Sequence, residues 1–171
     1  GTDRIAEVAR QLDADLVVNV QGDEPLIAPE AIEQAIAPML GDPSIVMGTL
    51  GAPLDEARDL PNPNVVKVLV DRHGFAIYFS RAAVPFRRQA TMLGTAVLQH
   101  VGMYVYRRAF LLALAELPRT PLEQAESLEQ LRAIEHGHRI KVAHTLYQSV
   151  SVDTPEDLEH VRRLAADGQL T

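Results

Sequence analysis

The feature that most restricts the fold of this chain is a short apolar run that ends at a polar, turn-forming loop. Residues 15–20, DLVVNV, have the length of a strand and carry mostly aliphatic side chains, and the loop QGDEP follows at 21–25. A run of this kind is typical of a central strand that is covered on both faces. Gly22 and Pro25 end it. Such a strand needs layers of structure on either side, which helices supply in an α/β fold.

Segments with strand character alternate with segments of helical periodicity along the sequence. Helices are predicted over 2–12 and 121–136, where apolar side chains recur at helical spacing. The runs 65–71 and 75–80, VVKVLVD and FAIYFS, flank a short turn and predict a β-hairpin. We therefore expect a single domain over residues 1–171, of the α/β class, with a mixed, mostly parallel sheet flanked by helices and an antiparallel hairpin excursion.

Composition excludes several classes of function. The formal net charge of −7 would repel a polyphosphate backbone, so we expect no nucleic-acid partner. The absence of cysteine excludes disulfides, thiol catalysis and cysteine-ligated zinc. No apolar run approaches the length of a membrane span and no signal peptide is visible, so we expect a cytoplasmic protein with no membrane partner.

Two acidic positions follow predicted strands that lie far apart in the sequence. Asp23 comes directly after the run 15–20, and Asp153 ends a short strand just before a helix that opens at Thr154. Ligands of open α/β sheets gather at the carboxyl ends of strands, and Mg²⁺ takes one or two carboxylates together with substrate phosphates. The two aspartates are therefore candidate Mg²⁺ ligands. The alternatives are an ordinary acidic turn at Asp23 and a helix-starting role for Asp153.

A third candidate feature is the strand predicted over 98–106. Residues four apart on a strand share a face, so His100 and Tyr104 lie together, while the intervening aliphatic side chains take the other face. A polar and aromatic face is expected of a pocket wall, although a half-solvated sheet face fits the pattern equally well.

Charged side chains elsewhere leave alternatives open. Arg81 follows the run 75–80 and has a planar fork suited to a carboxylate, although it could form a surface salt bridge instead. The helix predicted over 121–136 is acidic on one side, and its periodicity does not distinguish Glu129 from Glu126 as a site residue.

Seven stretches, in this order and over nearly the whole chain, resemble the 3-deoxy-manno-octulosonate cytidylyltransferases, also called CMP-Kdo synthetases. They are GTDRIAEV, VVNVQGDEPLI, NPNVVKV, IYFSRAAVPF, LQHVGMYVYR, PLEQAESLEQLR and VDTPEDLEHVR. The resemblance implies a nucleotide-diphospho-sugar transferase-like fold and an enzyme that joins Kdo to CTP. Its products would be pyrophosphate and CMP-Kdo for lipopolysaccharide biosynthesis. It also implies Mg²⁺ as the cofactor and a cytoplasmic homodimer.

The same resemblance implies roles for individual residues. The catalytic metal ligands would be Asp23 and Asp153. The residues that hold the sugar would be Gln21, Arg81, His100, Tyr104, Glu129 and Gln130. The residues near the nucleotide would be Gly1, Thr2 and Arg4.

One family feature has no counterpart in this sequence. Members of the family begin with a strand and a basic, glycine-containing loop that holds the triphosphate, and no such stretch occurs here. We therefore expect a chain that lacks its N-terminal nucleotide-binding segment and that is inactive or badly impaired by itself. Two alternatives stay open: a cytidylyltransferase for another acidic sugar such as sialic acid, and a non-catalytic fragment that dimerises.

Overall fold

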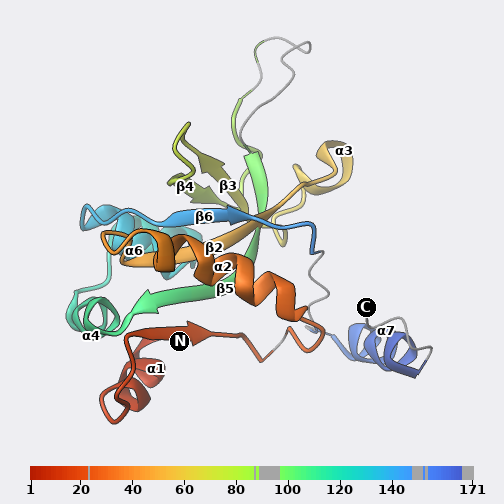
Figure 1. Ribbon diagram of the computed structural model, residues 1–171. Coiled ribbons are helices and arrows are strands. Elements are labelled where there is room, and N and C mark those ends of the chain that lie inside the picture. Colours follow the sequence, from red (N-terminus) through yellow and green to blue (C-terminus); the bar gives the residue numbers. More distant parts are fainter. Residues whose placement is uncertain (23, 87, 89–96, 148–151, 153, 167–171) are drawn as a thin grey trace.

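The computed structural model describes residues 1–171 except 23, 87, 89–96, 148–151, 153 and 167–171. Figure 1 shows a mixed sheet with helices on both faces, which confirms the predicted α/β class. The strands are β1 (Leu16–Asn19), β2 (Met47–Ala52), β3 (Lys67–Val70), β4 (Ala76–Ser80), β5 (Val97–Arg107) and β6 (Lys141–His144). The helices are α1 (Thr2–Ala9), α2 (Pro29–Gly41), α3 (Glu56–Asp59), α4 (Arg108–Glu116), α5 (Pro121–Glu126), α6 (Gln130–Glu135) and α7 (Pro155–Ala166).

The sheet is mixed, as predicted, but its pairing is mostly antiparallel. The strand order is β4-β3-β5-β2-β6, and β1 pairs with β5 beside β3. Within the described residues only β2 and β6 pair in parallel, while the other four pairings are antiparallel. The expectation of a mostly parallel sheet is therefore wrong. The reason is β5, which runs against β1, β2 and β3 and lies between strands that share one direction.

One edge of β5 carries two separate strands. β3 pairs with its beginning, from Lys67 opposite Gln99, and β1 pairs with its end, from Asn19 opposite Tyr104. The amide of His100 still donates to the carbonyl of Val66, at 2.8 Å. Between the start of β3 and the end of β1, a short stretch of this edge of β5 has no described strand partner, and the candidate site lies at this interval.

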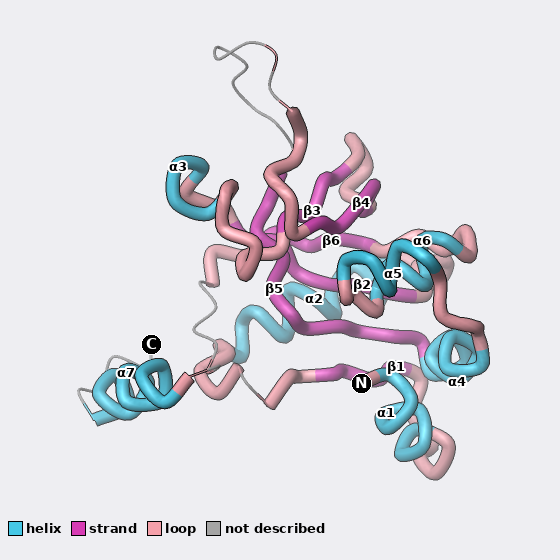
Figure 2. Tube along the Cα trace, turned by 180° about the vertical axis from the view of Figure 1, so that it is seen from behind, coloured by secondary structure: helices cyan, strands magenta, loops and turns pink. Residues whose placement is uncertain are grey.

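Two apolar layers enclose the sheet. Helix α2 covers one face, where Ala35 and Met39 lie in a cluster with Met103 of β5. Helices α1, α4 and α6 cover the other face (Figure 2). The buried cluster on that face includes Leu111 and Tyr106. The predicted division of β5 into two faces is confirmed. The alternative of a half-solvated face holds for part of it only: Tyr106 is 3% exposed beneath the helices, whereas His100 and Gly102 are partly exposed.

The helix predicted over 121–136 is two helices. Ser127 adopts a left-handed conformation with φ of 54°, and the amide of Leu128 donates to the carbonyl of Glu123 at 3.1 Å. This six-to-one bond and the left-handed residue are typical of a helix C-terminus. Because α5 ends here, the chain turns before α6, and Glu129 and Gln130 stand at the beginning of a new helix.

The structure corrects two further expectations. β1 is half-buried along its length and has β5 as its described strand partner, so complete burial at the centre of the sheet is wrong for this run. Helix α1 ends at Ala9 instead of continuing to residue 12. In the described part of the chain, no helix combines the length and apolarity needed to cross a membrane.

Candidate functional site

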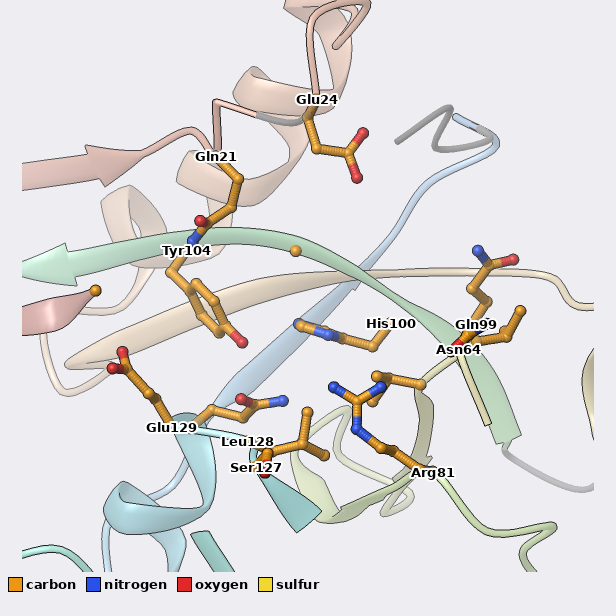
Figure 3. Close-up of a pocket in the computed structure, with 15 residues that line it drawn as sticks. Gln21, Glu24, Asn64, Arg81, Gln99, His100, Tyr104, Ser127, Leu128 and Glu129 are labelled. Carbon is orange, nitrogen blue, oxygen red and sulfur yellow. The ribbon is translucent and has the colours of Figure 1, made fainter. Parts of the chain in front are cut away.

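A pocket of about 640 Å³ opens at the interval between β1 and β3 (Figure 3). Its floor is β5, which contributes His100, Gly102 and Tyr104. Gln21, from the loop after β1, lies across Gly102 and points toward Tyr104. The loop before β3, the residue after β4 and the break between α5 and α6 supply the other walls. The pocket therefore forms between β1 and β3, where the edge of β5 has no strand partner among the described residues.

All six residues that the resemblance assigns to the sugar line this one pocket. They are Gln21, Arg81, His100, Tyr104, Glu129 and Gln130. They come from four segments that are far apart in the sequence, so sequence proximity does not explain their grouping. Their grouping is a finding, and their role in binding a sugar stays a prediction.

The residues expected near the nucleotide lie at the start of α1. Gly1 lines the pocket, and the amide and hydroxyl of Thr2 donate to Oε2 of Glu129 at 3.1 and 2.9 Å. Arg4 is exposed on α1 and is not one of the lining residues. The first turn of α1 is thus tied to the pocket through Glu129.

The two predicted metal ligands, Asp23 and Asp153, lie outside the described residues. Their neighbourhoods can be located. Glu24, next to Asp23, is buried and lines the pocket, and it accepts a hydrogen bond of 3.3 Å from the hydroxyl of Tyr147, which precedes Asp153 by a few residues. Among the residues that the structure does describe, no group of three acidic or imidazole side chains could hold a metal ion. The metal assignment therefore stays a prediction.

Arg81 is held by main-chain oxygens. Its Nε donates to the carbonyl of Glu126 at 2.9 Å and its Nη1 donates to the carbonyl of Pro63 at 3.1 Å. Its Nη2 has no partner within the described chain, and Figure 3 shows the guanidinium pointing into the pocket. A guanidinium restrained in this way presents its free edge to an anion, and a carboxylate fits that edge.

Glu126 anchors the segment that carries Arg81. Its carboxylate accepts hydrogen bonds from the amide of Arg81 at 2.9 Å and the hydroxyl of Ser80 at 2.7 Å. Although burial alone would raise the pKa of Glu126, these hydrogen bonds lower it overall, so the side chain is ionised at neutral pH. The structure thus separates the two glutamates that periodicity could not: Glu129 lines the pocket, and Glu126 supports it.

Lys67 is a second support that the sequence analysis missed. Its side chain is completely buried, and its Nζ donates to the carbonyls of Asn62 at 2.9 Å and Arg81 at 2.6 Å. Burial lowers the pKa of this lysine. The signal in the sequence was a single lysine within the apolar run 65–71, a position where a charge needs internal partners.

His100 and Tyr104 form an aromatic floor. Their ring centroids lie 5.4 Å apart, and Phe79 contacts the imidazole edge-on at 5.0 Å. Burial lowers the pKa of His100 to about 3 and raises that of Tyr104, so both rings are neutral at physiological pH. The imidazole is therefore a hydrogen-bonding group here and not a cation.

Gln130 carries an unsatisfied donor. Its side chain is 5% exposed, and its Nε2 has no hydrogen-bond partner among the residues that the structure describes. A buried donor without a partner is destabilising by about 1–3 kcal/mol, which is typical of a group that awaits a ligand. With the free edge of Arg81, the pocket offers one cationic end and several polar groups. That set suits a ligand with a carboxylate and several hydroxyls.

Comparison with known proteins assigns a family. Residues 1–140 match the cytidylyltransferase family. Over 164 residues the chain is 54% identical to 3-deoxy-manno-octulosonate cytidylyltransferase from Solibacter usitatus. The aligned region covers 96% of this chain and 65% of that protein. Over 170 residues it is 53% identical to the enzyme of the same name from Geobacter metallireducens, and the aligned region covers 94% of this chain and 67% of that enzyme. The chain thus spans about two thirds of the length of these curated relatives.

Solved structures give the same fold. The structure of CMP:2-keto-3-deoxy-manno-octonic acid synthetase complexed with CTP superposes with a TM-score of 0.91 at 40% identity, covering 98% of this chain and 68% of that one. A 4-diphosphocytidyl-2C-methyl-D-erythritol synthase from Anaerococcus prevotii superposes with a TM-score of 0.53 at 15% identity, covering 94% and 64%. The second likeness concerns the fold alone. The predicted nucleotidyltransferase-like fold is confirmed.

Proposed function

Because this chain belongs to the cytidylyltransferase family, among the 3-deoxy-manno-octulosonate cytidylyltransferases, we propose that the protein joins Kdo to CTP and releases pyrophosphate. The observation that carries the proposal is the pocket on β5. There the free edge of Arg81 and the unpaired amide of Gln130 face the same space as His100 and Tyr104. Kdo has one carboxylate and several hydroxyls, which match a cationic end and a set of neutral polar groups.

The chemistry is a transfer of CMP. The anomeric hydroxyl of Kdo attacks the α-phosphorus of CTP and loses its proton to solvent, while the bond from that phosphorus to the β-phosphate oxygen breaks. Pyrophosphate leaves with the bonding electrons. The pocket residues would bind and orient the sugar, with Arg81 paired to its carboxylate and Glu129 and Gln130 to its hydroxyls. Orientation of this kind lowers the barrier by removing the entropy cost of aligning two substrates.

The proposed cofactor is Mg²⁺, held by Asp23 and Asp153. Carboxylate oxygens are the ligands that Mg²⁺ prefers, and the contact between Tyr147 and Glu24 supports the idea that the two aspartate-bearing segments meet near the pocket. When bound, Mg²⁺ supplies neutralisation of the charge that develops on the phosphates. The homodimer, the cytoplasmic location and the role in lipopolysaccharide biosynthesis rest on the family resemblance and are part of the proposal.

Pyrophosphate release tests this function. The intact protein, meaning this chain together with a triphosphate-binding loop of the kind that the family carries, is incubated with CTP, Mg²⁺ and either Kdo or sialic acid, and the rate is followed with a coupled assay. We expect release with Kdo and little with sialic acid. Faster release with sialic acid would favour the alternative acidic sugar, and no release with either sugar would favour the non-catalytic alternative.

A matched pair of arginine variants locates the activity. Arg81→Met removes the guanidinium from the pocket, whereas Arg139→Met removes one that pairs with Asp71 at the surface. Loss of a charge-assisted pair to the sugar is expected to raise the KM for Kdo at least tenfold in the first variant only. Equal effects of the two variants would contradict a sugar site at Arg81.

A further inference from the structure

We propose that Thr49 is a positioning residue that holds His100 with its proton on Nε2, so that Nδ1 accepts a hydrogen bond from a hydroxyl group of the sugar. The inference deepens the proposed function and rests on it, because the ligand of the pocket is taken to be an acidic sugar. It concerns Nδ1 of His100, in the pocket floor, and Thr49, on the neighbouring strand β2.

The hydroxyl of Thr49 can donate only one proton. Thr49 is completely buried on β2, and its Oγ1 lies 2.7 Å from the carbonyl oxygen of Met103. A carbonyl cannot donate, so the hydroxyl proton points at Met103. The same Oγ1 lies 2.9 Å from Nε2 of His100. Since its proton is committed, Oγ1 accepts from the imidazole, and Nε2 is the nitrogen that carries hydrogen.

The strand register explains why these three groups meet. Thr49 lies opposite Tyr104, and the next residue, Leu50, lies opposite Val101, so the pairing of β2 with β5 shifts between them. The shift occurs along the stretch of β5 that holds Gly102 and Met103. It brings the carbonyl of Met103 within reach of a side chain on the neighbouring strand, below the imidazole.

The ring is neutral, so its second nitrogen has a free lone pair. Its aromatic neighbours are Phe79 and Tyr104, which carry no charge at neutral pH, and burial lowers the pKa of His100 to about 3. In a neutral imidazole that carries hydrogen on Nε2, Nδ1 is an acceptor. Nδ1 has no hydrogen-bond partner in the described part of the chain, and the ring lines the pocket.

This arrangement determines which ligand group can lie next to Nδ1 of His100. Nδ1 receives a donor, which in a sugar is a hydroxyl, and it repels an ether or carboxylate oxygen. A pKa near 3 also makes His100 a poor general base at neutral pH. The residue therefore discriminates among ligands by their hydroxyl pattern. Thr49 contributes to this discrimination without touching the sugar.

Nitrogen NMR of the imidazole tests the tautomer directly. The intact protein is labelled with ¹⁵N-histidine, and long-range proton–nitrogen correlations identify which nitrogen of His100 carries hydrogen. We expect the Nε2–H form, with no titration of this ring between pH 5 and 8. Kdo is then expected to shift the Nδ1 resonance. A ring protonated on Nδ1, or an Nδ1 resonance that Kdo leaves unchanged, would overturn the proposal.

Two variants of Thr49 add a functional readout. Thr49→Val has nearly the same shape but no hydroxyl, so His100 is expected to populate both tautomers and the KM for Kdo to rise roughly five- to tenfold with the KM for CTP unchanged. Thr49→Ser keeps the hydroxyl and is expected to restore both values. An unaltered tautomer and KM in Thr49→Val would overturn the role of Thr49. If Thr49→Val does not fold, the wild-type spectra still decide the tautomer.

The proposed function is assayed separately. Wild-type turnover of CTP with Kdo reports on the function, and the spectra of the free protein report on the tautomer. Absent turnover together with the Nε2–H form would count against the function. Normal turnover together with the Nδ1–H form would count against the proposal alone.

Discussion

The main-chain amide of Arg81 donates a hydrogen bond of 2.9 Å to Oε2 of Glu126, and the Nε of the same arginine donates to the carbonyl of Glu126 at the same distance. One residue at the end of α5 therefore fixes both the backbone and the side chain of Arg81. Ser80 and Tyr78 donate to the other carboxylate oxygen of Glu126, at 2.7 and 3.3 Å. The orientation of the guanidinium in the pocket depends on this carboxylate.

Glu126→Gln is expected to weaken Kdo binding although Glu126 does not line the pocket. The glutamine side chain has nearly the same size, but its NH₂ group replaces one accepting oxygen. That NH₂ donor would then point at another donor, either the Ser80 and Tyr78 hydroxyls or the Arg81 amide. We expect the KM for Kdo to rise on the order of tenfold, since about 1.4 kcal/mol corresponds to that factor. Steady-state kinetics measure it, with Glu116→Gln at the surface as the control. An unchanged KM in Glu126→Gln would contradict the supporting role.

Gln130→Met is expected to affect stability and binding in opposite directions. The unpaired Nε2 disappears, so its desolvation cost of about 1–3 kcal/mol is relieved and the free energy of unfolding stays level or rises. The KM for Kdo rises, because the sugar loses a donor. Chemical denaturation and steady-state kinetics of the same preparation check the two effects. A destabilised variant with normal KM would mean that the amide serves the fold and not the ligand.

The pair of Glu123 and Arg132 is expected to control stability at acid pH. Both side chains are nearly buried, and the hydrogen bonds from Arg132 lower the pKa of Glu123. A carboxyl with a depressed folded pKa stabilises the protein above its unfolded pKa, about 4.3, and this contribution is lost as the pH falls through the folded pKa. Glu123→Gln should therefore cost about 3 kcal/mol at pH 7 and progressively less below pH 4.

Denaturant unfolding at a series of pH values measures this dependence. The control is Glu116→Gln, which removes a pair with Arg10 whose side chains are mostly exposed and which is expected to change little. If the difference between Glu123→Gln and wild type were independent of pH, the buried ion pair would not be the cause.

Ser127 is expected to be sensitive to β-branching. Its φ of 54° suits glycine and is costly for valine. We expect the free energy of unfolding of Ser127→Val to lie about 1–2 kcal/mol below that of Ser127→Gly. Because the turn positions Glu129 and Gln130, the KM for Kdo should rise in the valine variant alone. Denaturation and kinetics of the two variants check this, and equal stabilities would show that the left-handed turn is not required.

The sequence predicted the elements better than their connections. Period-two alternation identified the faces of β5, and the hairpin of β3 and β4 followed from two apolar runs around a turn. The pairing of β1 and β5 could not be predicted, because apolar runs specify burial and not direction or neighbours. The break at Ser127 was missed because its backbone conformation depends on a hydrogen bond from Leu128 to Glu123, and periodicity does not report such a bond.

The candidate site was likewise predicted only in part. The residues that line the pocket came from the family resemblance, and the structure groups them. The residues that support them, Lys67, Thr49 and Glu126, form bonds across the fold that no local pattern encodes. Asp23 and Asp153 lie outside the described residues, so their meeting at a metal stays a prediction.

A crystal structure of the intact protein with Kdo tests the central claim most directly. We predict that the sugar lies on β5 between β1 and β3, with its carboxylate hydrogen-bonded to the free edge of Arg81 and a hydroxyl donating to Nδ1 of His100. A sugar bound elsewhere, or one whose carboxylate points away from Arg81, would contradict it.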